Sequence, residues 1–289
     1  MPKVSICIPA YNQVVYLKRT LDSILSQTYQ DYEIIVTDDT PGLIVKELVD
    51  QYDFAGKLRY FKNEKSLGTP QNWNEAIKKA GGDYIKILHH DDWFTTDTSL
   101  AQYVDLLDES GSYFAFSGSL VLFPNGDNWI HSILPGEIDK IKDNPFYLFL
   151  SNRIGSPSAI IYRKEVFEFF DINLKWLVDV DFYIRVIHKF KHVSYSPEPL
   201  VTTFGAEGRV TDFCIDNPQV EIFENFYVFD KVKPLLNLGQ LKYFFGGIMH
   251  LLRVCKKYRV STAEQIRDYG FTGKIPLWFL ITLKTYSLK

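Results

Sequence analysis

Val4-Ser-Ile-Cys-Ile-Pro-Ala-Tyr-Asn12 is the stretch that decides the fold of this 289-residue chain. Its first six residues form a short apolar run rich in β-branched side chains, which predicts a buried strand. Apolar residues then recur at helical spacing between Leu17 and Thr28. A buried strand followed by an amphipathic helix is the first unit of an α/β domain.

The strand–helix unit recurs along the first third of the chain. We expect strands at 33–37, 58–62 and 83–88, a helix at 44–52, and a helix at 69–80 with Thr69 as its cap and Pro70 in its first turn. This alternation predicts a Rossmann-like, mostly parallel sheet flanked by helices with right-handed crossovers. Later elements are expected at 99–107 (helix), 113–117 and 159–162 (strands) and 179–188 (helix), with helical structure from residue 214 onward.

Acidic pairs follow two of the predicted strands, Asp38-Asp39 after the second and Asp91-Asp92 after the fourth. Ligands of such sheets bind beyond the carboxyl ends of the strands, so both pairs are expected at one crevice. Unpartnered carboxylates gathered there would repel one another, and a divalent cation holding a diphosphate would relieve that repulsion. The alternative for each pair is an ordinary solvated turn before a helix.

Motifs of other phosphate-binding enzymes are missing. The turn Pro9-Ala10-Tyr11-Asn12 lacks the Gly-x-Gly-x-x-Gly of dinucleotide-binding domains. The chain also has no P-loop Gly-Lys-Ser/Thr and no Gly-x-Ser-x-Gly nucleophile elbow. A sugar nucleotidyltransferase would need a Gly-rich, Arg-containing loop after the first strand, which is absent.

Five stretches together resemble a family 2 glycosyltransferase of the GT-A fold. They are Val4–Asn12, Leu21–Thr28, Tyr32–Asp39, Asn72–Asn74 and Gly82–Asp92. The resemblance implies a GT-A domain over residues 1–213, with a nucleotide-sugar half at 1–115 and an acceptor half at 116–213. Residues 214–289 match no motif of the family, and their own pattern and charge predict a helical, basic segment. The implied reaction moves a sugar from a nucleoside diphosphate sugar, with a UDP-sugar favoured, to a hydroxyl of a glycan or lipid-linked acceptor, with inversion.

The same resemblance assigns the donor site residue by residue. It implies donor contacts from Pro9, Ala10, Tyr11, Asn12, Asp38, Asp39, Gln71, Asn72, His90 and Asp92. Asp39 would bind the base, and Gln71 stands where many members have Arg. Asp91 matches the metal-binding acid of the Asp-x-Asp element, for Mn²⁺ or Mg²⁺, whereas His89 replaces its first acid. Imidazole is a competent ligand for Mn²⁺ but a poor one for Mg²⁺; a ribose or phosphate contact, or simple packing, is the alternative for His89.

A general base is the second requirement, because an acceptor hydroxyl is a weak nucleophile. In the family the base opens a helix that ends in Arg, and Leu177–Arg185 fits, with Asp179 aligned to the base. A helix N-terminal carboxylate is the compatible alternative for Asp179. Many members also carry a later His that Pro199–Thr211 lacks, and Glu207 or Arg209 is expected near the phosphates instead. Acceptor contacts are expected from Trp93, Ser156, Trp176 and Asp181.

A catalytically weak or inactive module that binds a nucleotide or glycan is the alternative function. The His89 replacement and the missing later His motivate it. Against it stands the presence of both Asp91 and Asp179, which the reaction needs.

Charge is divided unevenly along the chain, although its net value is only -3. Residues 231–289 hold 11 Lys and Arg against Glu264 and Asp268 alone, so the remainder is acidic. The chain as a whole lacks the basic excess that nucleic-acid-binding proteins usually show. Three cysteines without metal-type spacing, no signal peptide and no long apolar run predict a cytoplasmic protein. The amphipathic stretch Leu241–Tyr258 is expected to cap the core, and peripheral contact with the anionic inner face of the membrane is the second interpretation.

Overall fold

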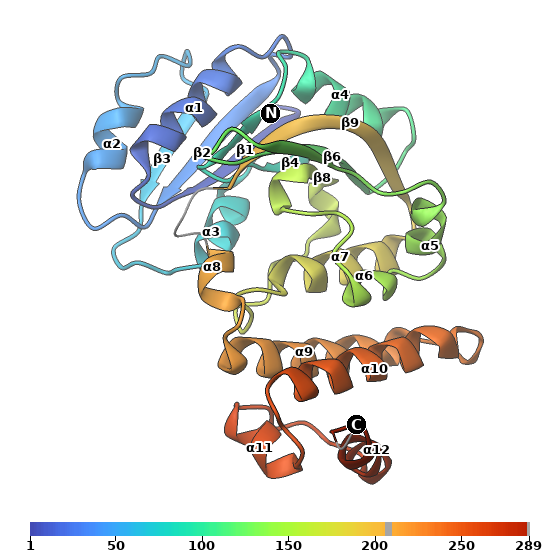
Figure 1. The fold of residues 1–289 in the computed structure, drawn as a ribbon. Coiled ribbons are helices and arrows are strands. Elements are labelled where there is room, and N and C mark those ends of the chain that lie inside the picture. Colours follow the sequence, from blue (N-terminus) through green and yellow to red (C-terminus); the bar gives the residue numbers. More distant parts are fainter. Residues whose placement is uncertain (206–209, 288–289) are drawn as a thin grey trace.

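The computed structural model describes residues 1–205 and 210–287, and one curved sheet of nine strands organises them (Figure 1). The strand order is β3-β2-β1-β4-β8-β6-β9-β5, with β7 paired to β6. The strands are β1 (Val4–Ala10), β2 (Tyr32–Asp38), β3 (Leu58–Lys62), β4 (Tyr84–Ile87), β5 (Asp92–Phe94), β6 (Phe114–Leu122), β7 (Asn128–His131), β8 (Ile160–Arg163) and β9 (Val193–Phe204).

Strand direction follows the repeated strand–helix units. β1, β2, β3 and β4 are mutually parallel, as their sequence spacing predicts. β8 runs antiparallel between β4 and β6, and β9 lies parallel to β6. The expected strands at 113–117 and 159–162 are therefore confirmed, whereas β5, β7 and β9 were not predicted. β5 has three residues, and its antiparallel partner β9 is distant from it in the sequence.

Helices cover both faces of the sheet, because the central strands are buried on both sides. The helices before β6 are α1 (Val14–Leu25), α2 (Ile44–Val49), α3 (Gln71–Lys79) and α4 (Ser99–Asp108). α1, α2 and α4 pack on one face, and α3 packs on the other together with α5 (Glu137–Asp143), α6 (Tyr147–Leu150) and α7 (Val178–Phe190). The mostly parallel α/β architecture is thus confirmed.

The start of α3 differs from the prediction. Thr69 does not cap the helix and Pro70 does not lie in its first turn. Pro70 occupies the N-cap position itself, the helix begins at Gln71, and no side chain caps it. Backbone contacts replace the cap, since the amide of Asn72 donates to the carbonyl of Gly68 at 2.9 Å.

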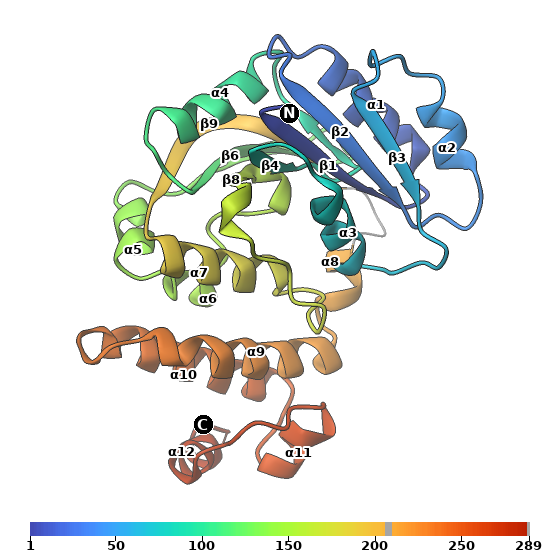
Figure 2. The ribbon, with the colours of Figure 1, turned by 180° about the vertical axis from the view of Figure 1, so that it is seen from behind.

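After α8 (Val210–Cys214), the C-terminal segment forms helices stacked beyond α6 and α7 (Figures 1 and 2). They are α9 (Pro218–Val232), α10 (Leu241–Lys257), α11 (Ala263–Asp268) and α12 (Leu277–Ser287). Phe229 of α9 packs on Phe146 and Phe149, so this segment shares a continuous apolar core with α6 and α7. Among the described helices, none combines the length and hydropathy needed to cross a bilayer.

The amphipathic helix expected at 241–258 is present as α10. Leu241, Phe245, Ile248, Leu252 and Cys255 share one helical face in the sequence, but the structure buries only three of them. Ile248, Leu252 and Cys255 are buried, whereas Leu241 and Phe245 are 49% and 60% exposed. The sequence places Lys242, His250, Arg253 and Lys257 opposite that face. The imidazole of His250 bonds the side chain of Asn225, Lys257 pairs with Glu221 and Asp216, Lys242 lies 4.8 Å from the ring centre of Tyr243, and Arg253 is exposed.

Candidate active site

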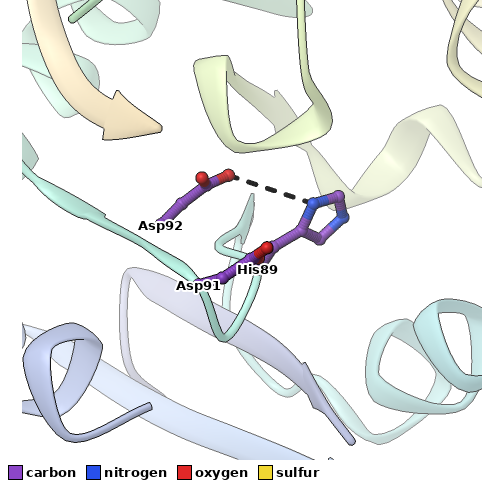
Figure 3. A group of neighbouring side chains, drawn as sticks. All are labelled: His89, Asp91 and Asp92. Atoms are coloured by element: carbon purple, nitrogen blue, oxygen red, sulfur yellow. Dashed lines mark ion pairs between the residues drawn. The ribbon is translucent and has the colours of Figure 1, made fainter. Parts of the chain in front are cut away.

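The turn between β4 and β5 gathers the imidazole and carboxylates that could hold a metal ion. His89, Asp91 and Asp92 each offer one ligand atom, and these atoms lie within 4.8 Å of one another (Figure 3). The Nδ1 of His89 lies 4.0 Å from Oδ2 of Asp92. Asp92, assigned to the donor from sequence, therefore joins the candidate metal set with His89 and Asp91.

Neighbouring elements fix this turn in place. Thr20, buried on α1, donates its hydroxyl to the carbonyls of Asp92 at 2.7 Å and His90 at 3.0 Å. Ser158 accepts the amide of His89 at 3.0 Å. Trp73, on α3, packs its ring on the His89 imidazole with centres 4.6 Å apart. The cluster is thus held from α1, α3 and the segment before β8.

The pKa values of the side chains in this cluster suit the binding of a metal cation. Burial lowers the pKa of His89 to about 4, which leaves a neutral imidazole at neutral pH. Burial, with the charge of Asp91, raises the pKa of Asp92 to about 8. Nε2 of His89 is buried and has no hydrogen-bond partner among residues 1–205 and 210–287. A neutral imidazole beside two acids, one of which takes up a proton to relieve crowding, is a donor set that fits a divalent ion.

The loops after β1 and β2 form the wall where the sequence places the nucleotide. Pro9 and Ala10 are buried at the end of β1, and the carbonyl of Pro9 contacts Nδ1 of His90 at 3.1 Å. Tyr11 is 48% exposed, and Asn12, which follows it, adopts a φ of 58°. The Tyr11 ring is therefore available to a ligand.

Asp38 and Asp39 have different surroundings. Asp38 is fully buried, and its oxygens accept from the amide of Thr40 at 2.7 Å, the Tyr60 hydroxyl at 2.6 Å and the Lys62 ammonium at 3.0 Å. Asp38 therefore holds the loop, and the direct donor contact expected from sequence does not fit this burial.

Asp39 accepts three N–H groups, from the Asn63 side chain at 2.7 Å, the Leu67 amide at 3.1 Å and the Gly68 amide at 2.7 Å. Asp39 is also buried, at 4% exposure, and a carboxylate offers about four lone-pair sites, of which the described residues use three.

Asn72 is buried, whereas its neighbour Gln71 is exposed. The Asn72 amide donates to the carbonyls of Ala10 and Thr37 at 3.3 and 3.1 Å and accepts from Asn63 at 2.8 Å. Asn72 therefore links the ends of β1 and β2 through buried hydrogen bonds. Gln71, at the first turn of α3, is exposed and free to face a ligand.

Asp179 lies in the first turn of α7, as the sequence predicts. Its Oδ2 accepts from the Asn152 side chain at 2.7 Å and its Oδ1 from the Val180 amide at 2.8 Å. Burial raises its pKa to about 7, and the nearby Glu224 adds to that rise. A carboxylate with this pKa near neutral pH is poised to accept a proton.

One segment links Asp179 to the turn at 89–92. Asn152 both bonds Asp179 and donates to the carbonyl of Gly155 at 3.2 Å. Ser156, predicted on the acceptor side, then approaches Oδ2 of Asp92 at 3.5 Å. The candidate base and the metal cluster thus face the same segment, residues 152–158, from its two ends.

Glu224 is a residue that sequence reasoning missed. Its carboxylate, buried on α9, accepts the amides of Lys175, Trp176 and Leu177 at 2.7, 3.0 and 2.7 Å. These are the backbone groups just before α7. A helix outside every recognised motif therefore positions the start of the helix that carries Asp179, and no local sequence signal marks it.

The residues predicted to contact the acceptor differ in whether the structure leaves them accessible to it. Asp181 is fully buried and pairs with Arg185 at 2.9 Å and Lys231 at 2.8 Å, so it joins α7 to α9 and does not face an acceptor. Trp93 lies on β5 beside Phe204, with Arg19 5.7 Å from its ring centre. Trp176 is partly exposed just before α7. Glu207 and Arg209 lie outside the described residues.

A second missed residue is Trp129 on β7. It is 49% exposed, and its ring meets His131 edge-on at 5.3 Å. Nε2 of His131 contacts the carbonyl of Arg153 at 3.1 Å, so both rings lie on the side of β7 that faces residues 152–158. The missed signal is the alternation of Trp129 and His131 in a short strand after a turn at 124–127.

Comparisons with known proteins identify the family of the chain. The sequence profile of glycosyl transferase family 2 matches residues 5–170. An uncharacterized glycosyltransferase of Methanocaldococcus jannaschii is 30% identical over 190 residues, which cover 64% of this chain and 65% of that protein. A GalNAc(5)-diNAcBac-PP-undecaprenol beta-1,3-glucosyltransferase of Campylobacter jejuni is 33% identical over 94 residues, 32% of this chain and 30% of that protein. The chain spans less than two thirds of both relatives.

The fold has a solved counterpart as well. The crystal structure of residues 1–349 of TarS from S. aureus, in complex with UDP-GlcNAc, superposes with a TM-score of 0.66 at 19% identity. The superposition covers 97% of this chain and 79% of that one. The likeness extends to the C-terminal helices and establishes a GT-A fold.

Proposed function

The chain belongs to glycosyl transferase family 2, and we propose that it transfers a sugar, with inversion, from a nucleoside diphosphate sugar to a hydroxyl acceptor. The observation that carries the proposal is the pairing of two groups across residues 152–158. On one side lie His89, Asp91 and Asp92, and on the other lies Asp179 with its pKa raised to about 7.

The donor is proposed to lie along the ends of β1 and β2, between Tyr11, Asp39 and Gln71. The open lone pair of Asp39 suits an N–H of a base, and a UDP-sugar is the favoured donor. The complex of TarS with UDP-GlcNAc supports this preference. Asp38 and Asn72 act beneath the surface by fixing these loops.

In the proposed reaction, Asp179 accepts the proton of the acceptor hydroxyl as its oxygen bonds the anomeric carbon. The bond from that carbon to the diphosphate oxygen breaks at the same time, and attack from the opposite side inverts the configuration. A divalent ion held by His89, Asp91 and Asp92 would neutralise charge on the leaving diphosphate. Asn152 orients the Asp179 carboxylate by its hydrogen bond.

The acceptor is proposed to be a glycan or a lipid-linked saccharide. The name of the Campylobacter jejuni relative, an undecaprenol-linked glucosyltransferase, supports the lipid-linked class. Trp129 is proposed as a platform for an acceptor sugar, because its exposed ring lies on the side of β7 facing the segment that holds Asp179.

A donor screen followed by a release assay tests the proposal. Thermal shift of the full chain with Mn²⁺ and a panel of nucleotide sugars identifies the donor, since a ligand of the folded state raises the melting temperature. Nucleoside diphosphate release is then measured for the wild type, Asp179→Asn and the control Asp105→Asn, whose carboxylate is exposed on α4.

We expect Asp179→Asn to keep the donor shift but to lose about 10²- to 10⁴-fold in turnover, the range typical of a general base. The product should carry the inverted anomeric configuration by NMR. Full turnover by Asp179→Asn would refute the assignment of the base. Donor binding by the wild type without transfer to any acceptor would establish the alternative, a binding module.

A further inference from the structure

An apolar and basic face on the last helices stands apart from the donor and acceptor sites. On α10, Leu241, Phe245 and Met249 follow one another every four residues and are 49%, 60% and 39% exposed. On α12, Leu277, Trp278 and Ile281 are 73%, 47% and 58% exposed. We call these six residues the α10–α12 face.

The two halves of this face lie on helices that pack against each other, with the partly buried Phe244 between Phe245 and Trp278. Phe244 packs edge-on against Phe245 with ring centres 5.9 Å apart, and it contacts Trp278 at 6.3 Å. Both views place α10 and α12 together, on the side of the molecule remote from β1–β4 (Figures 1 and 2). A soluble monomer rarely exposes apolar patches of this kind unless something binds them.

Charge on the same helices has one sign. The sequences of α10 and α12 contain no acidic residue, and the exposed cations Lys242, Arg253, Lys256 and Lys284 accompany the apolar side chains. The two acids of residues 231–289, Glu264 and Asp268, both lie on α11. The two helices therefore offer exposed apolar and aromatic side chains together with exposed side chains of positive charge only.

We propose that the α10–α12 face docks on an anionic lipid bilayer, as a peripheral contact. Apolar side chains with an interfacial Trp enter the headgroup boundary, while flanking Lys and Arg bind anionic headgroups. A second copy of the chain is the less suitable occupant, because a two-fold interface would bring the same cations together. If the acceptor is lipid-linked, which rests on the proposed function, docking would bring the enzyme to it.

Vesicle sedimentation of the full chain tests this docking. Vesicles of phosphatidylcholine alone are compared with vesicles that also contain phosphatidylglycerol, at low and high salt. The variants are Phe245→Ser/Trp278→Ser and Lys242→Glu/Arg253→Glu, all at exposed positions. The matched control is Phe167→Ser, because Phe167 is 78% exposed just after β8 and belongs to neither helix.

We expect binding only to the anionic vesicles, weakened by salt, and a partition coefficient at least about tenfold lower in both double variants but not in Phe167→Ser. Trp278 fluorescence should shift to the blue with anionic vesicles. Wild-type binding to neither vesicle, or equal binding by all variants, would overturn the proposal. Light scattering measures whether the chain forms dimers. If the wild type is a dimer and Phe245→Ser/Trp278→Ser is a monomer, a second copy of the chain occupies the α10–α12 face instead.

Donor-induced thermal shift without vesicles separates this proposal from the proposed function. The double variants should keep the wild-type donor shift, because none of their positions touches the donor site. If a double variant loses vesicle binding but keeps the donor-induced thermal shift, the substitutions have affected the α10–α12 face and not the donor site. If the wild type shows no donor-induced shift, the result counts against the proposed function and not against membrane docking.

Discussion

At the scale of single residues, Asp179 predicts the pH dependence of the reaction. Its pKa is raised to about 7, so it is protonated and unable to accept a proton below that pH. We expect kcat/KM to rise with pH up to about 7 and then to level off. Asn152→Ala removes a hydrogen bond that lowers the Asp179 pKa, so the rise should move to higher pH.

The control for Asn152→Ala is Asn237→Ala, an exposed asparagine before α10. Its pH profile should overlay that of the wild type. An unchanged profile in Asn152→Ala would contradict the assignment of Asp179 as the group that titrates.

A second prediction for a single residue concerns His89 and the choice between Mn²⁺ and Mg²⁺. A neutral imidazole favours Mn²⁺ over Mg²⁺, whereas a carboxylate suits Mg²⁺. We expect His89→Asp to lower the ratio of Mn²⁺-supported to Mg²⁺-supported turnover about tenfold or more. His192→Asp, at an exposed histidine, should leave this ratio unchanged. An equal ratio in His89→Asp would remove His89 from the metal set.

At the scale of elements, the β6–β7 hairpin predicts an acceptor contact. Trp129→Ala should raise the acceptor KM about tenfold, a loss of ~1.4 kcal/mol, with kcat and donor KM nearly unchanged. Trp278→Ala is the matched control, since Trp278 is 47% exposed on a different element. If a soluble acceptor saturates both variants alike, Trp129 is not part of the acceptor site.

The contact of α9 with the start of α7 carries the next prediction. Glu224→Gln leaves one amide oxygen for three N–H groups, and we expect a loss of about 1–3 kcal/mol in the free energy of unfolding by urea. The lost charge should also lower the Asp179 pKa, so the rise in kcat/KM moves to lower pH. Glu75→Gln, on α3, should change neither quantity; a shift to higher pH in Glu224→Gln would contradict this electrostatic account.

For the molecule as a whole, ion pairs join α7 and the segment before it to α9. Lys231 of α9 contacts Asp171 at 2.6 Å and Asp181 at 2.8 Å, and both acids are largely buried. Lys231→Met leaves two buried carboxylates short of a partner and should cost about 3 kcal/mol of unfolding free energy. Lys18→Met, which breaks an exposed pair with Asp22, should cost less than about 1 kcal/mol.

Acid titration checks the same contact. Burial opposes ionisation of Asp171, but the Lys231 bond prevails and the Asp171 pKa falls to about 2. The stability from this lowered pKa is complete above the unfolded pKa of roughly 4 and is lost as the pH falls toward 2. Lys231→Met should flatten that loss, and an equally steep acid dependence would contradict the pairing.

The sequence by itself determined the parallel half of the sheet and its polar edge. Buried strands such as Val4–Ala10 are contiguous apolar runs, and helices between them repeat at fixed spacing, so local pattern suffices. It also placed Asp91, His89 and Asp179, because each directly follows or opens a recognisable element.

Only the tertiary structure decided which polar residues face a ligand and which support the loops. Burial and hydrogen bonding depend on residues distant in the chain, so Asp38 proved fully buried, and Asp181 proved an ion-pair partner of Lys231. Glu224 reaches the start of α7 from 47 residues away, which no local pattern records. The exposure of Leu241 and Phe245 likewise depends on how α10 packs against α9 and α12, and that packing was needed to find the α10–α12 face.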